Sequence, residues 1–313
     1  MLVLKDLKPT VVRSPYRMII YGRAGLGKST FASQAPNPIF ADIENGTKAL
    51  PVTRLPAPVD SHGKDTAWTW AYFKTCLVEL YKQDHEFQTF VVDSLDWLTK
   101  LMIEHVIDTF NAGKPKEHCA TSLQDLGGFG HGYLLLDKEV IYLVNALSAI
   151  RDKHKMNIIL TAHEYSEGKI VKDLVHGEYE RYDMKSDSKR VNATMTEWCD
   201  YVFRAAQDLK VKIDGNKAKG AKGKAELKDR ILYTRDFGAI HAKRRIVLPD
   251  TIDLDYASFK KAEDAAYVIQ EKTARTAYSD DRVRSSRAIE IPNSMMMIPF
   301  EKLNGYGVPV SFN

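Results

Sequence analysis

Residues 22–30 have the sequence Gly22-Arg23-Ala24-Gly25-Leu26-Gly27-Lys28-Ser29-Thr30. This stretch matches the phosphate-binding pattern G-x-x-x-x-G-K-[ST] without departure. The glycines let the backbone curl so that successive N–H groups point at phosphate oxygens. A helix that begins at Lys28 would add the positive end of its dipole. All nine residues are therefore predicted to bind the phosphates of a nucleoside triphosphate.

Two side chains of this loop have separate expected roles. Lys28 would reach the β- and γ-phosphates, and the Ser29 hydroxyl would take a place on Mg²⁺. The flanking residues agree with the motif, because an apolar strand-like run at 17–21 precedes the loop and a short helix is expected at 30–34. Strand, loop and helix in this order are what the motif requires, which makes a chance match a poor explanation.

Composition sets broad limits on the protein. Its 313 residues, 44% of them hydrophobic, suffice for one large domain or two small ones with a buried core. The net charge of +4 is mild, so any affinity for nucleic acid must come from local patches. Three cysteines, at 76, 119 and 199, lie far apart and form no C-x-x-C pair. They indicate neither a disulfide framework nor a zinc site, and they fit a reducing cytosol.

No targeting or membrane segment is recognisable. Charged residues near the N-terminus, Lys5, Asp6 and Lys8, have no apolar segment behind them, so no signal peptide is predicted. No run approaches the roughly eighteen apolar residues of a membrane span. We therefore expect a soluble, cytoplasmic protein that does not bind a membrane.

Strand-like and helix-like segments alternate up to residue 205. Strands are expected at 17–21, 39–44, 89–93, 158–163 and 201–204, and helices at 30–34, 66–83, 95–110, 133–154. Residues 111–132 and 165–190 are expected to be loops, the second with the option of an extended hairpin. This alternation predicts an α/β fold with a mainly parallel central sheet that helices cover on both faces.

Beyond residue 205 the pattern changes. Residues 209–213 and 227–235 alternate like strands around a Lys- and Gly-rich tip at 216–224, a third strand is expected at 240–248, and a helix at 256–274. We expect these strands to extend the sheet in antiparallel fashion. The predicted organisation is an N-terminal extension (1–15), an ATPase core (16–277) and a C-terminal tail (278–313) that ends in a Met-rich run of unassigned role.

Acidic residues end two of the expected strands, at the sheet edge where ligands bind in open α/β folds. Asp93 ends the hydrophobic run Phe90-Val91-Val92 and so has the Walker B form, which predicts that it holds Mg²⁺ through water. An ordinary strand end is the alternative. The residue after it is Ser94, whereas AAA+ ATPases and many helicases have a glutamate there to polarise the attacking water.

The neighbouring strand offers the missing carboxylate. Hydrolysis requires a base within reach of the water, and Glu44 ends the strand at 39–44, with Asp42 beside it. Alternation along a strand puts both acids on one face, and Glu44 lies nearer the loop. Glu44 is therefore the predicted catalytic base, and a solvated loop acid is the alternative.

Taken together, these segments resemble the RecA-like branch of phage single-strand annealing proteins, the Sak-type ATPases. The similarity spans about residues 10–270. It is carried by 21–30 with the helix 31–35, by 36–46, 91–96 and 157–163, and by the basic run 242–245 before Leu248-Pro249.

The resemblance implies a RecA-like P-loop core that uses ATP and Mg²⁺. It also implies binding of single-stranded DNA, annealing or pairing in homologous recombination, and self-association into a ring or filament. A single-strand-binding protein is a further partner to consider. A phage-encoded chain of this kind would work in the cytoplasm of its host.

The resemblance also suggests a role for His163, which ends the strand at 158–163. In RecA-like proteins a polar residue at this strand end senses the γ-phosphate and transmits its presence to the following loop. RecA itself has glutamine there, so histidine departs from that form. A histidine that ends the strand without a catalytic role is the alternative.

Two loops correspond to the segments that face single-stranded DNA in the RecA fold. Cations that bind phosphates and aromatic rings that stack on bases suit such binding without sequence preference. Acidic residues interrupt both loops, so solvated loops are the alternative, and the basic tip at 216–224 has the same two interpretations. The predicted DNA-binding residues are Lys114, Lys116 and Phe129 in the first loop and Lys169, Lys172, Arg181, Lys185, Lys189 and Arg190 in the second.

A basic cluster near the end of the sheet has an expected role in an assembly. RecA-like assemblies place basic residues from this region across the subunit interface onto the neighbour's γ-phosphate. Such a cation can raise the rate by about 10³ or more. Lys243 and Arg245, two residues apart on one strand face, are the predicted residues. A surface cluster without this role is the alternative.

The leading hypothesis is thus a DNA-stimulated, Mg²⁺-dependent ATPase that anneals or pairs single strands. A ring-forming, helicase-like motor shares its sequence signs and would differ by unwinding or translocation. A small-molecule kinase would need an arginine-rich lid near the phosphate loop, and the sequence has no obvious one. A nucleotide-gated structural component with little turnover is a fourth possibility.

Overall fold

The computed structural model describes residues 10–165, 169–173, 177–186, 188–213 and 223–284. By its internal contacts the chain divides into two units, residues 12–268 and residues 1–11 together with 269–313. Most of the predicted extension (1–15) and tail (278–313) lies outside the described residues, so those two boundaries remain predictions. None of the helices within the described ranges is long and apolar enough to cross a membrane.

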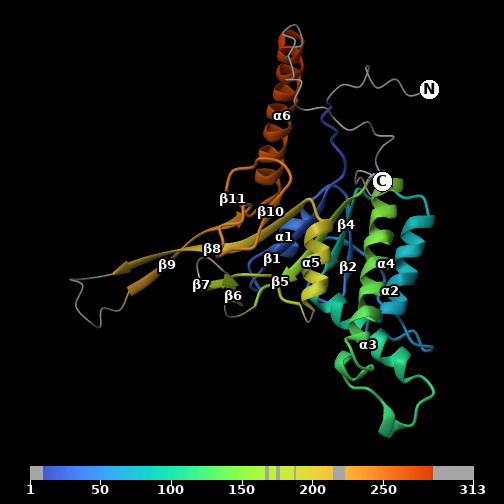
Figure 1. The fold of residues 1–313 in the computed structure, drawn as a ribbon. Helices are drawn as coiled ribbons and strands as arrows, with labels where there is room; N and C mark the ends of the chain where they lie inside the picture. The colour runs from blue at the N-terminus through green and yellow to red at the C-terminus, as the bar shows by residue number, and fades with distance from the viewer. Residues whose placement is uncertain (1–9, 166–168, 174–176, 187, 214–222, 285–313) are drawn as a thin grey trace, which may run out of the picture. The chain divides into compact units, whose positions relative to one another are not determined.

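The larger unit is built on a central sheet with the order β11-β9-β8-β1-β5-β4-β2-β3, and β10 pairs with β8 (Figure 1). The strands from β8 to β3 in this order run parallel to one another. Their bounds are β1 (Arg17–Gly22), β2 (Pro38–Asp42), β3 (Thr53–Arg54), β4 (Thr89–Asp93), β5 (Asn157–His163) and β8 (Tyr201–Ile213).

Helices cover both faces of this sheet, as the alternation of segments predicts. They are α1 (Lys28–Ser33), α2 (Trp70–Lys82), α3 (Leu95–Asn111), α4 (His131–His154), α5 (Lys189–Trp198) and α6 (Tyr256–Arg284). Helices α2 to α5 bury their apolar residues on one face, and α1 and the start of α6 bury theirs on the other.

Strand β1 shows why the sheet is buried on both sides. Its side chains alternate between the two faces, so that Ile19 and Tyr21 join the core under α2 to α5 while Met18 and Ile20 join the core under α1 and α6. All four residues are fully buried. An unbroken apolar run is therefore required in β1, and the same is true of β4, in which every residue is buried.

The antiparallel extension is present, but its strands differ from those expected. Residues 201–204 and 209–213 belong to one strand, β8, which pairs antiparallel with β9 (Gly223–Tyr233), and β9 pairs antiparallel with β11 (Thr251–Asp253). The tip predicted at 216–224 falls mostly outside the described residues.

The strand predicted at 240–248 is wrong. Only β10 (Lys243–Arg244) pairs with β8 there. The chain then turns away, with the Arg245 N–H donating to the Asp200 carbonyl at 3.2 Å, while Ile246 and Leu248 are buried in the core under α1 and α6. Their apolar character reflects core packing rather than strand pairing.

Several helix boundaries also differ from the sequence prediction: α1 begins at Lys28 rather than 30, α4 at His131 rather than 133, and α6 extends to Arg284 rather than 274. Helix α2 begins at Trp70 instead of Thr66, because the Thr69 hydroxyl accepts the Tyr72 N–H at 3.2 Å and caps the helix. Helix α5 occupies residues that were expected to be the end of a loop, so Lys189 and Arg190 lie in its first turn.

Residues 111–132 are irregular, as expected, and two short 3₁₀ turns, η2 (Lys116–His118) and η3 (Leu123–Asp125), lie within them. The Ser122 and Asp125 side chains form a capping box around η3. Helix α4 then packs so closely on η3 that a Cβ at Gly132 would lie 2.1 Å from the Leu123 carbonyl oxygen. Glycine is therefore required at the start of α4.

We predict that Gly132→Ala lowers the free energy of unfolding by about 1–3 kcal/mol, as overpacking typically does. The clash is with backbone, which cannot rotate away, and it outweighs the higher helix propensity of alanine. Gly128→Ala is the matched control, because a Cβ there would meet no atom within 4 Å. Chemical denaturation of both variants measures the difference, and equal stability of the two would contradict the packing argument.

Candidate nucleotide-binding site

The phosphate loop leaves β1 at Gly22, where the chain passes very close to β8. A Cβ at Gly22 would lie 2.5 Å from the Ala205 carbonyl oxygen, so no other residue fits without moving the loop. The loop ends at Gly27, which is the N-cap of α1 and has φ +102° in the left-handed region. Glycine is thus required at position 22 for steric reasons and favoured at position 27 by the backbone conformation.

Lys28 holds the loop together from within. Its Nζ donates to the carbonyl oxygens of Gly22 at 3.0 Å and Arg23 at 2.9 Å. Burial lowers the pKa of Lys28, and the nearby carboxylates of Asp93 and Glu44 act against this lowering. The ammonium group therefore lies inside the loop, close to two carboxylates. A bound phosphate would be a stronger partner for it than the two neutral carbonyl groups.

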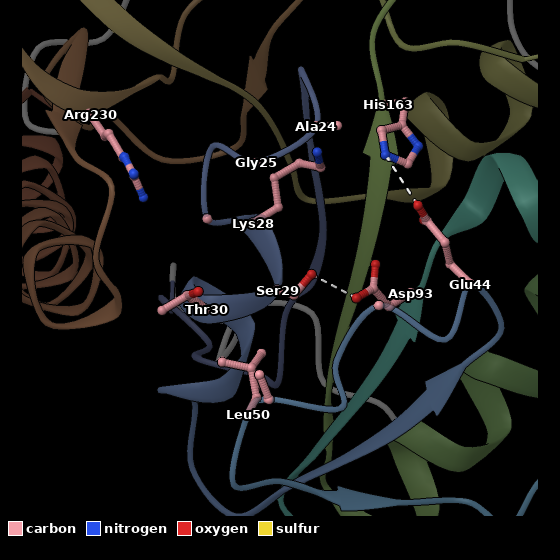
Figure 2. A pocket seen from close by; sticks show the side chains of 13 residues that line it. Ala24, Gly25, Lys28, Ser29, Thr30, Glu44, Leu50, Asp93, His163 and Arg230 are labelled. Atoms are coloured by element: carbon pink, nitrogen blue, oxygen red, sulfur yellow. Dashed lines mark hydrogen bonds and ion pairs between the residues drawn. The ribbon is translucent and has the colours of Figure 1, made fainter. Parts of the chain in front are cut away.

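Ser29 and Asp93 lie together as the motifs predict. The Ser29 hydroxyl donates to Asp93 Oδ2 at 2.7 Å (Figure 2). The Thr161 hydroxyl of β5 donates to Asp93 Oδ1. Asp93 is only 5% exposed, so these bonds satisfy a carboxylate that would otherwise be costly to bury.

This pair of oxygen ligands suits Mg²⁺. The ion binds through one or two protein oxygens, substrate phosphates and several waters, rather than through a cage of side chains. No group of three or more His, Cys, Asp or Glu with metal-site geometry occurs among the described residues. Ser29 and Asp93 are the residues that would hold the ion, and their role as its ligands stays a prediction.

The two acids at and after the end of β2, Asp42 and Glu44, have different surroundings. Asp42, the last residue of the strand, accepts the N–H groups of Gly46 and Thr47 and the Thr47 hydroxyl, so it shapes the turn. Glu44 lies beyond the strand, in the pocket. The alternation argument that placed both acids on one strand face was therefore wrong, but the turn brings Glu44 into the pocket by another route.

His163 lies between two acids. Its Nδ1 is 3.0 Å from Asp96 Oδ2, and its Nε2 is 3.7 Å from Glu44 Oε1 (Figure 2). The hydrogen bond with Asp96 raises the pKa of His163, against the opposing effects of burial and of Lys28. Burial works against ionisation of Asp96, but its bonds with His163 and Ser94 hold the pKa of this carboxyl below its usual range. Charged forms of both groups are thus favoured.

The base predicted from the sequence has a second contact. The Ser94 hydroxyl donates to Glu44 Oε2 at 3.2 Å. Ser94, which stands where many P-loop ATPases have a glutamate, therefore orients the carboxylate that comes from the neighbouring strand end.

Sequence reasoning missed a buried acid next to His163. The side chain of Glu164 is 1% exposed and accepts from Arg204 of β8 at 2.9 Å and from Arg23 of the phosphate loop at 3.2 Å. The Arg204 guanidinium also lies 3.8 Å from the centre of the Tyr182 ring. The sequence offered little indication of this role. Glu164 belongs to no motif, and its two arginine partners are distant in the chain.

These residues surround a pocket of about 350 Å³. It also has a wall that the sequence did not predict, because Arg230 of β9 lines it from the side opposite Glu44 and Asp93 (Figure 2). Arg230 is 200 residues beyond the loop in the chain, and no local motif marks it. The lining residues are Ala24, Gly25, Gly27, Lys28, Ser29, Thr30, Glu44, Gly46, Ala49, Leu50, Asp93, His163 and Arg230.

The segment after β5 forms a hairpin, the alternative noted for residues 165–190. Strands β6 (Lys169–Asp173) and β7 (Gly177–Arg181) pair antiparallel. The hairpin is anchored on the pocket, because Glu164 bridges Met184 and the Lys185 N–H donates to the His163 carbonyl at 2.7 Å. Both ends of the hairpin therefore meet the end of β5.

Several of the predicted DNA-binding cations are paired with acids. Lys172 pairs with Glu178 across the hairpin at 3.0 Å, Arg181 with Asp236, and Arg190 with Asp137 at 2.6 Å. The last residue lies in α5, as does Lys189, so the prediction that these two belong to a loop is wrong. Lys185 and Lys189 are exposed, and the side chain of Lys169 lies outside the described part of the chain.

The predicted residues of the other loop lie at the surface. Lys116 is exposed within η2, and Lys114 Nζ lies 3.0 Å from the centre of the Phe110 ring. Phe129 is fully exposed and has φ +60°. The hairpin follows β5, whereas this loop lies at the far ends of α3 and α4 (Figure 1). The two predicted DNA segments therefore occupy different places on the unit.

Lys243 and Arg245 lie far from the pocket of their own chain. Strand β10 pairs with the start of β8, which is the sheet edge opposite the phosphate loop. Lys243 Nζ donates to the carbonyls of Thr196 and Glu197, and Arg245 pairs with Asp200 at 2.8 Å. Any contact of these cations with a γ-phosphate would thus require a neighbouring subunit.

The strand order and the loop after β1 define a P-loop NTPase of the RecA-like type, with β5 between the phosphate-loop strand and β4. A family model described as the AAA domain matches residues 14–246, and the chain belongs to this family. Comparison with curated proteins gave no match. Among solved structures, the crystal structure of the RadB recombinase is similar at a TM-score of 0.38 and 12% identity, over 78% of this chain and 90% of that one.

We predict that His163 titrates above its ordinary pKa of about 6.5 and that Asp96→Asn lowers this pKa, because the hydrogen bond from the carboxylate is its main cause. Because the pKa of His163 is higher in the folded chain than in the unfolded chain, protonation of His163 stabilises the fold. This contribution is fully present below the unfolded-state pKa and is lost as the pH rises through the folded-state pKa. NMR titration of the histidine side chains measures the shift. Glu44→Gln is the control, with a smaller decrease expected, and an unchanged pKa in Asp96→Asn would contradict the assignment.

Proposed function

We propose that this protein is a Mg²⁺-dependent ATPase that binds single-stranded DNA and promotes annealing or pairing in homologous recombination, similar to the Sak-type proteins of phages. The observation that carries the proposal is the direct attachment of the hairpin, in which cations, acids and tyrosines alternate, to the residues around the nucleotide pocket. A change in the pocket would then reach the hairpin directly through the backbone that joins them.

The coupling has two physical routes. His163 faces Glu44 in the pocket and accepts the Lys185 N–H at the base of the hairpin. Glu164 joins Arg23 of the phosphate loop to Arg204, whose guanidinium covers Tyr182 just past β7. Both routes are short chains of hydrogen bonds and ion pairs, which can transmit a shift because they have few alternative arrangements.

The site residues divide the work of hydrolysis. The loop N–H groups and Lys28 bind the phosphates, and Glu44 accepts the proton of the attacking water. Ser94 and His163 orient the two oxygens of Glu44. Mg²⁺, when bound by Ser29 and Asp93, would neutralise charge on the β- and γ-phosphates.

DNA binding is the less direct part of the proposal. Exposed Lys116, Lys185 and Lys189 offer charges to a phosphate backbone, and fully exposed Phe129 offers a ring to stack on a base. The ion-paired residues Lys172 and Arg181 would have to exchange an acid for a phosphate. Self-association is also part of the proposal. Lys243 and Arg245 would then contact the γ-phosphate bound by a neighbouring subunit.

We predict that ATP hydrolysis by the full chain rises when single-stranded DNA is added, because binding at the hairpin would reorder the pocket. Hydrolysis with and without DNA, together with the mass of the assembly, measures this effect. Phosphorylation of a small molecule without any DNA effect would contradict the proposal in favour of a kinase. Strand unwinding without annealing would favour a motor.

Glu44→Gln is expected to retain ATP binding and to lower turnover by about 10²-fold or more, the usual contribution of a general base. Glu86→Gln is the matched control, because Glu86 is exposed and lies outside the pocket. Lys28→Ala should instead abolish binding, which separates lost affinity from lost chemistry. Normal turnover in Glu44→Gln would mean that another residue activates the water.

A further inference from the structure

Arg230 occupies a place in the pocket that neither the motif nor the hydrolytic residues account for. It comes from β9, the antiparallel neighbour of β8, and lines the same pocket as Lys28 and Glu44. One guanidinium nitrogen, Nη1, lies 3.2 Å from where a Cβ would stand at Gly27. The side chain therefore rests against the end of the phosphate loop.

The backbone of Arg230 is fixed on both sides. It pairs with Gln207 of β8, next to an irregularity in the register, and its carbonyl accepts the Leu254 N–H at 2.9 Å. Figure 2 shows the guanidinium extending from β9 towards the loop, with Glu44 and Asp93 on the other side of Lys28. The sheet thus holds this cation at one end of the pocket.

The charge of Arg230 has no protein partner within the described residues. The other arginines nearby do have one: Arg204 pairs with Glu164 at 2.9 Å, and Arg235 with Asp250 at 3.5 Å. An exposed guanidinium that lines a phosphate pocket without an acid to neutralise it is suited to bind an anionic ligand, and its planar fork matches phosphate oxygens.

The position defines which part of a nucleotide it would meet. Lys28, Asp93, Glu44 and His163 gather at the end of the pocket where the terminal phosphate and the water belong. Arg230 lies away from Asp93 and Glu44 and near Gly27, so we expect it on the side where a bound nucleotide would continue past its β-phosphate.

We propose that Arg230 contacts the bound nucleotide of its own chain at the phosphates nearer the nucleoside, and that it supplies affinity rather than chemistry. This inference rests on the proposed function only in taking an adenine nucleotide as ligand. Under this proposal the antiparallel part of the sheet contributes to nucleotide binding, because Arg230 of β9 forms one side of the pocket.

The test is the affinity of the full chain for ATP and for ADP with Mg²⁺ and without DNA, measured by calorimetry. Arg230→Ala should raise both dissociation constants about 10- to 100-fold, as loss of a charged hydrogen bond does. Arg230→Lys should restore part of the affinity. Turnover at saturating ATP should match that of the unaltered chain, because the residue does not act on the water.

Arg235→Ala is the matched control, an exposed arginine that follows β9 but lies outside the pocket, and it should leave both constants unchanged. Unchanged affinities in Arg230→Ala, a loss for ATP alone, or lower turnover at unchanged KM would each overturn the assignment. If the unaltered chain bound no nucleotide, this inference and the proposed function would fail together. Absence of DNA stimulation alone would overturn only the latter.

Discussion

The buried carboxylate of Asp93 is the point on which the site depends. Hydroxyl groups from α1 and β5 donate to its two oxygens, and its backbone carbonyl accepts the N–H groups of Ile43 and Glu44 at 2.8 and 3.2 Å. One residue thus joins the phosphate loop, strand β5 and the turn that carries the proposed base. Because an unsatisfied buried carboxylate is costly, these elements are held in register before any ligand arrives.

Of the groups that the structure describes around Asp93, the buried acids have cationic partners, whereas two of the cations in the pocket have no acidic partner. Glu164, whose side chain is 1% exposed, has two arginine partners, and Asp96 is paired with His163. Lys28 donates only to loop carbonyls, and Arg230 has no partner within the described part of the chain. Two of the cations that line the pocket, Lys28 and Arg230, therefore have no carboxylate hydrogen bond within the described residues. This distribution leaves positive charge where phosphates would bind and neutralises it where the fold must be stable.

Residues near each other in the chain could be predicted well. The phosphate loop, Asp93 at the end of a buried strand and His163 at the end of another follow from local pattern, because each motif carries its own strand and turn. Glu44 was placed in the pocket for a partly wrong reason, since β2 ends at Asp42 and a turn, rather than strand alternation, orients it. The loop prediction failed at Lys189 and Arg190, where helix α5, which the sequence analysis did not predict, begins.

The sequence by itself determined the phosphate loop and the parallel, helix-covered sheet, because hydrophobic runs of strand length and the glycine spacing act over a few residues. The tertiary structure alone decided that Glu164 links Arg23 to Arg204, that Arg230 closes the pocket, and that Lys243 lies at the opposite sheet edge. These contacts join residues from 40 to about 200 positions apart. Their geometry is set by which strands become neighbours in the sheet, and no local pattern encodes that order.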